Sequence, residues 1–345
     1  MKRLLISILA MLTGLMLITG CQKDTGTPLS DEQIEQDARM EILTDDNSSD
    51  ELSEYLIDWG IDDGSEDNMY DGFSSFSPDL SLPKILSPIQ NVVRFGRKIN
   101  RRGIREVEII RVAEDTIYYR VTRRLMGKFI IFEKLDTLSG SPDTIVIHRK
   151  NLQHDVMRKA IFVKRTPNED GYRNPRKRWR LAAVSLCLGE SKPVPTVKIE
   201  KIGITTGSGD SLTFTDPLQT MLWIPQDIPT FLKGDVVTVT ALVSNSTLNP
   251  VPDPITGATE TVLLHFGINR SHHARKRFEY KGIDPATGFN IYQGSWTVRE
   301  PAHPHRPFHA VVDVIDNGTI YDSDEQTYPY NSNTWGCPYR VVLFK

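Results

Sequence analysis

The sequence predicts an α+β domain followed by an all-β sandwich, and three patterns in the chain favour this division. Residues 80–190 combine a helix-compatible stretch, Lys84–Phe95, with several runs rich in β-branched and aromatic residues. The sequence KPVPT at 192–196 then indicates a Pro-rich hinge. After the hinge, short apolar runs alternate with turn signals, a pattern typical of sandwiches.

The first twenty residues are typical of a secretory signal. Lys2 and Arg3 precede an apolar run from Leu4 to Ile18. This run is shorter than the ~20 residues that a transmembrane helix needs, and polar residues follow it at once. We therefore expect residues 1–20 to be removed before the protein works, and they do not enter the fold prediction.

The sequence LITGC at 17–21 resembles the lipobox of bacterial lipoproteins. This resemblance implies cleavage after Gly20 and acylation of Cys21, which would anchor the body to a membrane by buried acyl chains. By resemblance to Gram-negative lipoproteins, in which an Asp at this position favours the inner membrane, Gln22 implies the outer membrane, with the body facing either the periplasm or the cell surface. The alternative is an ordinary cleaved signal followed by a cysteine without a role.

Residues 21–79 predict an acidic tether that contains two short helices. Between Asp24 and Asp71, seventeen acidic residues are opposed only by Arg39. Ser30 and Gln33 have the spacing of a capping box, which indicates the start of the first helix. A helical apolar stripe in LSEYLIDW, residues 52–59, indicates the second.

Residues 80–190 predict a curved antiparallel sheet after the Lys84–Phe95 helix. We expect turns at LMG, residues 125–127, and at KNLQHD, residues 150–155. Helices followed by a sheet that ends in RWRLAAVS resemble the nuclear transport factor 2-like superfamily of cone-shaped α+β domains, which includes both enzymes and scaffolds. The expected strands are Glu106–Val112, Thr116–Thr122, Lys128–Lys134, 143–149, 158–165 and 178–188.

His148 is the residue on which an enzymatic interpretation of this domain depends. Paired with Asp143 or Glu133 inside a cone, it could act as an acid or base. The alternative is a histidine that faces solvent or is satisfied in the core.

Residues 191–217 predict a hinge and a hairpin, Val197–Ile204 with Ser211–Thr215, and residues 218–345 predict a β-sandwich. Segments such as KGDVVTVTALVSNST and FHAVVDVIDNGTIY resemble the immunoglobulin-like and fibronectin-III-like modules of secreted bacterial proteins. The expected strands are 221–225, 234–245, 260–268, 275–281, 291–300, 307–318 and 338–345.

Alternating strand direction in such a sandwich predicts which cysteines and which histidines lie close together. Cys187 and Cys337 would lie at the same pole, so they could form a disulfide in an oxidising compartment, or remain two buried thiols. Loops at the far pole would gather histidines, which could bind Zn²⁺, could gain charge near pH 6, or could simply be exposed among arginines. These histidines are His272, His273, His303 and His305.

A strongly basic block in the first predicted domain indicates what kind of partner the protein could bind. Between Lys84 and Arg180 there are twenty-four Lys or Arg and ten Asp or Glu. This block could be a solvated surface, or it could bind an anionic lipid, a lipid A phosphate or an acidic glycan. No nucleic-acid-binding motif accompanies it, and the predicted compartment excludes nucleic acid. The candidate patch comprises Arg97, Lys98, Arg101, Arg102, Arg123 and Arg124.

Together these features predict a lipoprotein of the outer membrane that binds an envelope partner and performs no catalysis. The sequence contains no G-x-S-x-G, H-E-x-x-H, Walker A or C-x-x-C motif. We expect no cofactor, Zn²⁺ being the one exception raised above. The alternatives are an enzyme with its pocket in the α+β cone and a purely structural spacer.

Overall fold

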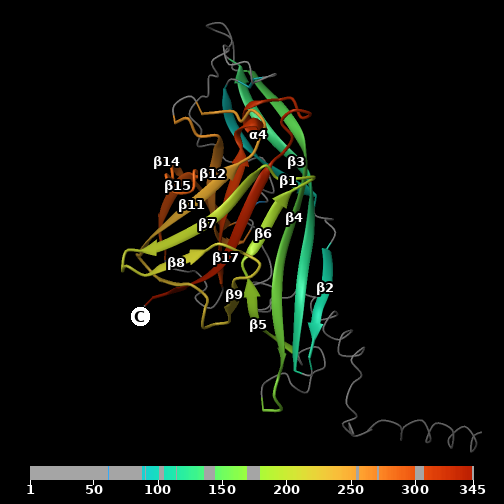
Figure 1. The fold of residues 1–345 in the computed structure, drawn as a ribbon, viewed down its shortest axis with the longest axis vertical. Coiled ribbons are helices and arrows are strands. Elements are labelled where there is room, and N and C mark those ends of the chain that lie inside the picture. Colours follow the sequence, from blue (N-terminus) through green and yellow to red (C-terminus); the bar gives the residue numbers. More distant parts are fainter. Residues whose placement is uncertain are drawn as a thin grey trace, which may run out of the picture.

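The computed structural model describes residues 61, 88–89, 91–100, 105–113, 115–135, 144–168, 179–253, 256–269, 272–299 and 307–343. These residues are nearly all β-strand, and their one helix is the five-residue α4 (Asn317–Tyr321) (Figure 1). The strands form two sheets that pack face to face as a β-sandwich. The predicted α+β class, with its nuclear transport factor 2-like cone, is therefore wrong.

The larger sheet has twelve strands, and its main path is β1-β3-β4-β6-β17-β16-β12-β13. Four further strands branch from that path, with β2 on β3, β5 on β4, β9 on β5 and β10 on β17. The path strands are β1 (Val92–Asn100), β3 (Thr116–Leu135), β4 (Thr144–Lys164), β6 (Cys187–Ser191), β17 (Ser332–Val342), β16 (Phe308–Asp316), β12 (Glu260–Asn269) and β13 (His272–Arg277). The branching strands are β2 (Arg105–Val112), β5 (Trp179–Ser185), β9 (Met221–Trp223) and β10 (Thr230–Leu232).

The smaller sheet has five strands in the order β14-β15-β11-β7-β8 and lies on the left in Figure 1. Buried aliphatic side chains of β7 and β11, such as Ile202 and Val239, pack against Val312 and Trp335 of the larger sheet. The alternation of buried and half-exposed residues along β11 is what one covered face requires. The five strands are β14 (Glu279–Ile283), β15 (Asn290–Thr297), β11 (Val236–Asn245), β7 (Val197–Thr206) and β8 (Ser211–Phe214).

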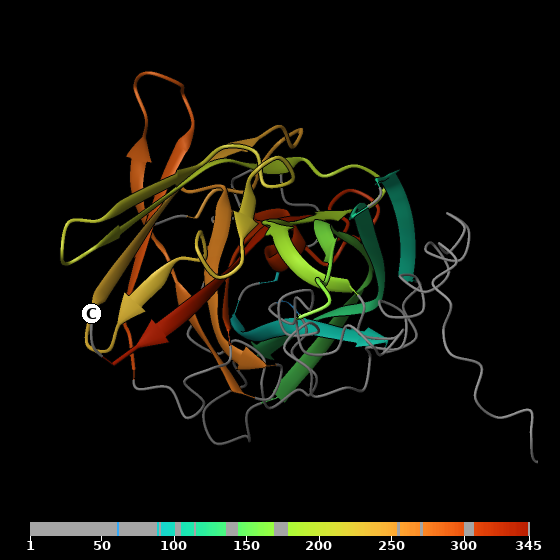
Figure 2. The same cartoon turned by 90° about the horizontal axis from the view of Figure 1, so that it is seen from below.

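A second core lies where β1, β3 and β4 face β12, β16 and α4. Phe95, Phe129, Val311 and Tyr321 belong to it. The strands of the larger sheet curl around this core, as the view from below shows (Figure 2). Ile61, the one described residue of the predicted tether, is 3% exposed and packs into the same core. The two helices predicted in that tether lie outside the described residues.

The helix predicted at Lys84–Phe95 is wrong. Val92–Phe95 begins β1, and Pro88 forms an isolated antiparallel bridge with Asp322. In β1 the buried residues Val92 and Phe95 belong to the second core. Two adjacent valines and a phenylalanine favour a strand, and burial of Val92 and Phe95 on the covered face of the sheet stabilises that conformation.

The turn predicted at residues 125–127 is also wrong, because β3 runs through it without a break. A Cβ atom at Gly127 would lie 2.0 Å from the carbonyl oxygen of Lys98 in β1. The glycine therefore permits a close approach of two backbones rather than a turn. Strands β3 and β4 pair continuously from Thr116↔Val163 to Leu135↔Thr144. This pairing also removes the turn predicted at residues 150–155.

Much of the strand pattern predicted for the second half of the chain is confirmed. The predicted hairpin is β7 and β8, paired from Ile202↔Phe214 to Thr205↔Ser211. The run 275–281 is instead two strands, because Phe278 separates β13 in the larger sheet from β14 in the smaller one.

The larger sheet runs across the predicted domain boundary at residue 190. Strand β6 pairs with β4 on one side and with β17 on the other. Backbone hydrogen bonds therefore join the first predicted domain to the second. Within the described residues, no helix has the length and apolar character needed to cross a membrane.

Candidate functional site

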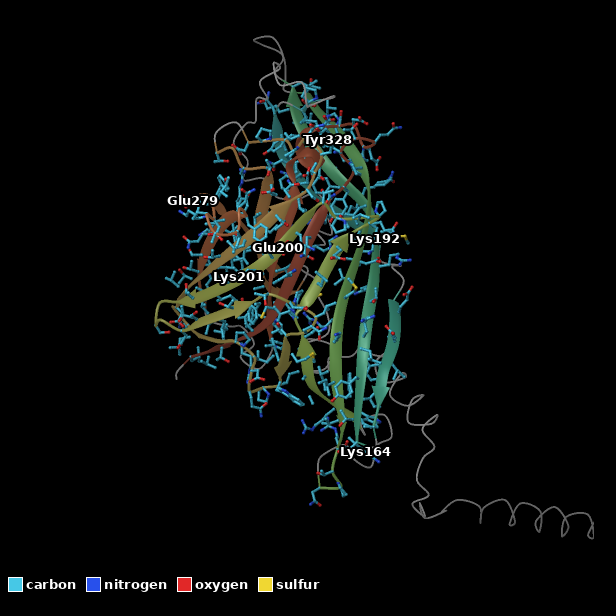
Figure 3. The ribbon with its side chains drawn as sticks, in the orientation of Figure 1. Lys164, Lys192, Glu200, Lys201, Glu279 and Tyr328 are labelled. Carbon is cyan, nitrogen blue, oxygen red and sulfur yellow. The ribbon has the colours of Figure 1, made fainter. Side chains whose placement is uncertain are left out.

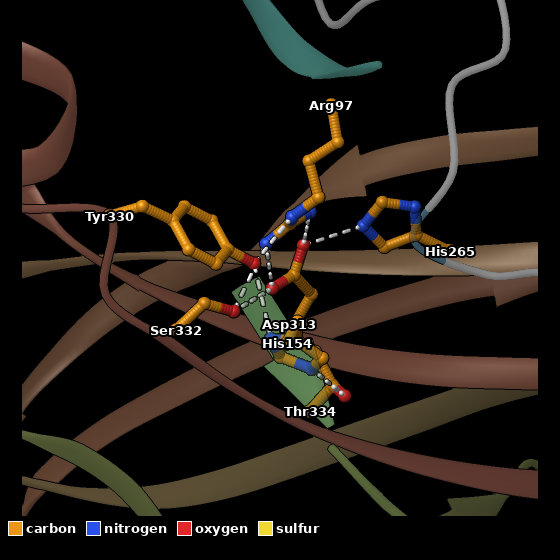
Figure 4. Close-up of polar contacts among 7 residues, drawn as sticks. All are labelled: Arg97, His154, His265, Asp313, Tyr330, Ser332 and Thr334. Carbon is orange, nitrogen blue, oxygen red and sulfur yellow. Dashed lines mark hydrogen bonds and ion pairs between the residues drawn. The ribbon is translucent and has the colours of Figure 1, made fainter. Parts of the chain in front are cut away.

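A buried ion pair joins the curled end of the larger sheet to its middle (Figure 4). Arg97 of β1 donates from both terminal nitrogens to the carboxylate of Asp313 in β16, at 2.6 and 2.8 Å. Both side chains are at most 2% exposed. Strand alternation places Asp313 on the face that carries Val311 and Ile315 of the second core.

Neighbouring polar groups complete the hydrogen bonding of this pair. Arg97 also donates from Nε to the Tyr330 hydroxyl at 2.8 Å and from a terminal nitrogen to Ser332 Oγ at 3.0 Å. Asp313 is 3.0 Å from His265 Nε2 and accepts from Ser332 at 2.9 Å. Each charge is thus held by several fixed partners, which is the condition for tolerating buried ions.

His154 of β4 extends this network of hydrogen bonds through Tyr330 and Thr334. Its Nδ1 lies 3.2 Å from the Tyr330 hydroxyl, and its Nε2 lies 3.4 Å from Thr334 Oγ1. Gly189 of β6 faces this ring, and a Cβ there would lie 2.4 Å from His154 Nε2. The buried polar network comprises Arg97, His154, His265, Asp313, Tyr330, Ser332 and Thr334.

Burial fixes the protonation states inside this network. Burial lowers the pKa of His154 to about 3, reinforced by the charge of Arg97, and lowers the pKa of His265 to about 4. For Asp313, burial alone would raise the pKa, but Arg97 and His265 outweigh it and lower the pKa. At neutral pH both histidines are therefore neutral, while Asp313 and Arg97 are charged.

We expect the free energy of unfolding to decrease as the pH falls below 6.5. The lowered histidine pKa values mean that the unfolded chain binds protons that the folded chain does not. The loss should approach about 1.4 kcal/mol per pH unit for each histidine, between the unfolded value and the folded ones. Urea unfolding at about pH 7 and about pH 5 measures this slope. His154→Gln should make the slope shallower, and equal stability at both pH values would contradict the assignment.

A buried lysine holds α4 and the segment that follows it. Lys150 of β4 is 1% exposed and donates to the carbonyl oxygens of Gly318 and Tyr328, at 2.9 and 2.5 Å. Burial lowers the pKa of Lys150 to about 8, although nearby acidic residues, Asp322 first among them, oppose this shift. The lysine therefore acts as a fixed hydrogen-bond donor that ties the segment to β4.

Glu133 and His148 do come together, as the enzymatic alternative required. His148 Nε2 lies 2.8 Å from Glu133 Oε2, and the His148 side chain is 23% exposed. A described cavity of about 20 Å³ lies elsewhere, between the two sheets, among apolar residues such as Phe231 and Trp335. That volume holds at most about one water molecule. The cavity therefore supplies no substrate site beside the Glu133–His148 pair.

The predicted basic patch is not one surface. Arg97 is buried in the polar network, so its inclusion in an exposed patch was wrong. Arg124 pairs with Asp155 at 3.0 Å, and the neighbouring Arg123 points to the other face of β3. Lys98 is exposed on the outer face of β1. Arg101 and Arg102 lie outside the described residues.

Lys98 belongs to a larger basic surface that sequence analysis missed. On the face of β1, β3 and β4 opposite the second core, the register places Lys98 beside Lys128, and Arg94 beside Phe132. Alternation within the strands could have revealed this grouping, but only once the register was known. We call this surface the basic outer face, and it comprises Arg94, Lys98, Lys128, Lys134 and Arg149 with Met126, Phe132, Ile145 and Ile147.

The predicted disulfide is not formed. Cys187 and Cys337 are both buried as thiols, on adjacent strands β6 and β17. Cys187 lies opposite Gly336, so Cys337 is one residue out of register and its side chain points to the other face of the sheet. Burial raises the pKa of the Cys337 thiol to about 12.

We expect a thiol count on the full chain to distinguish an acylated Cys21, an unmodified Cys21 and a Cys187–Cys337 disulfide. Native protein should not react with a thiol reagent, because both described thiols are buried and Cys337 resists ionisation. Denatured, unreduced protein should yield two thiols if Cys21 is acylated, whereas three would mean that Cys21 is unmodified. A denatured chain with no reactive thiol would show that the disulfide forms after all.

The side chains of the four histidines in the predicted zinc site lie outside the described residues. His303 and His305 lie outside the described residues, and only the backbone of His272 and His273 is described, at the start of β13. No group of three or more His, Cys, Asp or Glu side chains that could hold a metal ion occurs in the described part of the chain.

The fold and these contacts define an all-β sandwich protein with a buried polar network and a basic outer face. Comparison with protein-family models finds no match for this sequence, and comparison with curated proteins finds none either.

Proposed function

We propose that this protein is an outer-membrane lipoprotein whose all-β body, with an immunoglobulin-like sandwich in its second half, is a non-catalytic binding module for an anionic partner in the cell envelope. The lipobox-like sequence LITGC supports the anchor at Cys21. Tethering to a membrane raises the effective concentration of nearby partners, so that weak surface contacts suffice.

The observation that carries the binding role is the distribution of charge. Inside the molecule, Arg97 and Asp313 neutralise each other and bond to fixed neighbours, so they serve the architecture. Outside, Lys98 and Lys128 lie directly opposite each other on paired strands. Like charges in that arrangement destabilise a sheet, and an anionic partner would relieve the repulsion.

Metabolic labelling with a palmitate analogue tests the anchor. Native protein should carry the label and remain in the outer-membrane fraction after a high-salt wash, because acyl chains rather than charges hold it there. The Cys21→Ser variant should carry no label. Equal labelling of the two, or release of the native protein by salt, would contradict the proposal.

A further inference from the structure

We propose that the basic outer face binds the surface of an anionic lipid bilayer, so that the tethered body lies against the membrane. This inference rests on the proposed lipid anchor and names the partner of the body. It is drawn from the arrangement of charged and apolar side chains on one sheet face, each placed by strand register.

The positive charges form a cluster that crosses all three strands. Lys98 lies opposite Lys128, and Arg149 lies opposite Ile130 one pleat further along. All three basic side chains are exposed, whereas Ile130, which lies between them on the same face, is 2% exposed. Lys128 donates to Asn151, the neutral residue opposite it on β4, at 2.5 Å. Three cations that converge on one face are complementary to the phosphates of a lipid surface.

Among the described residues, the acidic side chain that shares the outer face of β4 is Asp155, which lies four residues beyond Asn151 and pairs with Arg124 at 3.0 Å. Glu133 points to the inner face, where it meets His148. Glu325 reaches only the edge of β4, where it accepts a hydrogen bond from the backbone N–H of Asn151. The cluster therefore keeps a net positive charge.

Apolar side chains continue the same face beyond the charges. Ile145 is 47% exposed and Ile147 is 37% exposed, and the two lie two residues apart on β4. Phe132 lies opposite Ile147, and the guanidinium of Arg94 stacks over its ring at 5.9 Å. Exposed isoleucines bordered by cations are what an interfacial surface needs, because the former enter the headgroup region while the latter bind phosphate.

This combination favours a bilayer over an acidic glycan or a soluble anionic protein. A glycan would satisfy Lys98, Lys128 and Arg149 but would leave Ile145 and Ile147 exposed to water. A bilayer binds the three cations through its phosphates and also covers the two isoleucines. An anchor at Cys21 would hold the body within reach of the bilayer. A body that binds anionic polymers, but whose isoleucines do not enter the bilayer, would therefore favour a glycan or a protein over a lipid surface.

The test uses the full acylated chain in vesicles and a water-sensitive fluorophore attached at Ile147→Cys. A matched label at Leu248→Cys, a residue 85% exposed between β11 and β12, reports on a surface outside the basic outer face. With phosphatidylglycerol in phosphatidylcholine vesicles, the label at 147 should shift to the blue and be quenched by spin-labelled lipid. The label at 248 should do neither.

Charge reversal provides the second arm. Lys98→Glu, Lys128→Glu and Arg149→Glu together should weaken the body's contact with anionic vesicles by roughly 100-fold. The matched control reverses Lys198, Lys201 and Lys281 of the smaller sheet, and should keep the shift. These lysines are exposed, and Lys201 appears in Figure 3 on the side away from β3 and β4.

The outcomes separate this inference from the proposed function. If the chain floats with vesicles of either composition but the label at 147 stays in water, the anchor stands and the basic outer face does not bind lipid. If the chain floats with neither, the anchor itself fails. An equal shift at 248, or an equal shift in pure phosphatidylcholine, would also overturn the inference.

Discussion

Replacing Arg97 by Met should lower the free energy of unfolding by about 3–5 kcal/mol, among the largest effects of any single substitution in the protein. The variant leaves the carboxylate of Asp313 buried, at 0% exposure, without the guanidinium that neutralises it. Such an uncompensated charge accounts for most of the loss. Urea unfolding followed by tryptophan fluorescence measures it.

Two companions make the Arg97 result interpretable. Lys98→Met changes the exposed neighbour on the same strand and should alter stability by no more than about 0.5 kcal/mol. Adding Asp313→Leu to Arg97→Met removes both charges and should restore much of the loss, because no unpaired charge stays buried. A single variant as stable as the native chain would show that the ion pair does not hold β1 in place.

Gly127→Ala should be the second severe substitution, with a loss of about 1–3 kcal/mol or more. The added Cβ would lie 2.0 Å from the Lys98 carbonyl oxygen and 3.0 Å from Ile99 Cα, both in the backbone of β1. Backbone atoms cannot rotate away as a side chain can, so β1 must move off β3. Arg97 moves with it, and its bonds to Asp313 and Tyr330 are weakened.

The matched control is Gly203→Ala in strand β7. There the nearest atom to the added Cβ is the Thr240 carbonyl oxygen at 4.0 Å, which is an ordinary contact. We expect little change in the urea midpoint for Gly203→Ala and a clear decrease for Gly127→Ala. Equal midpoints for the two variants would contradict the close approach of β1 and β3.

The sequence predicted the strands of the second half well, because period-two alternation and turn residues are local signals. The run 234–245 became β11, and the predicted hairpin became β7 and β8. The first half misled in the places where a long-range contact decides the structure. Gly127 is a local signal for a turn, but in the structure it allows the backbone of β1 to approach β3 closely. Strand β1 is distant from Gly127 in the sequence, although it is the neighbour of β3 in the sheet.

The site was harder to predict than the fold. Asp313 within the apolar run FHAVVDVID signals a buried acid that needs a partner, but nothing local identifies Arg97, 216 residues earlier. Arg97 therefore resembled one more surface cation in a basic block. His154 was placed in a turn for a similar reason, since its partners Tyr330 and Thr334 come from the far end of the chain.

Mass spectrometry of the amino-terminal peptide from native envelopes tests the central claim, a lipid-anchored binding body, most directly. The account predicts a peptide that begins at Cys21 and carries a diacylglycerol on the thiol and an acyl chain on the α-amino group. A peptide that begins at Met1, or one in which Cys21 carries no lipid, would contradict it.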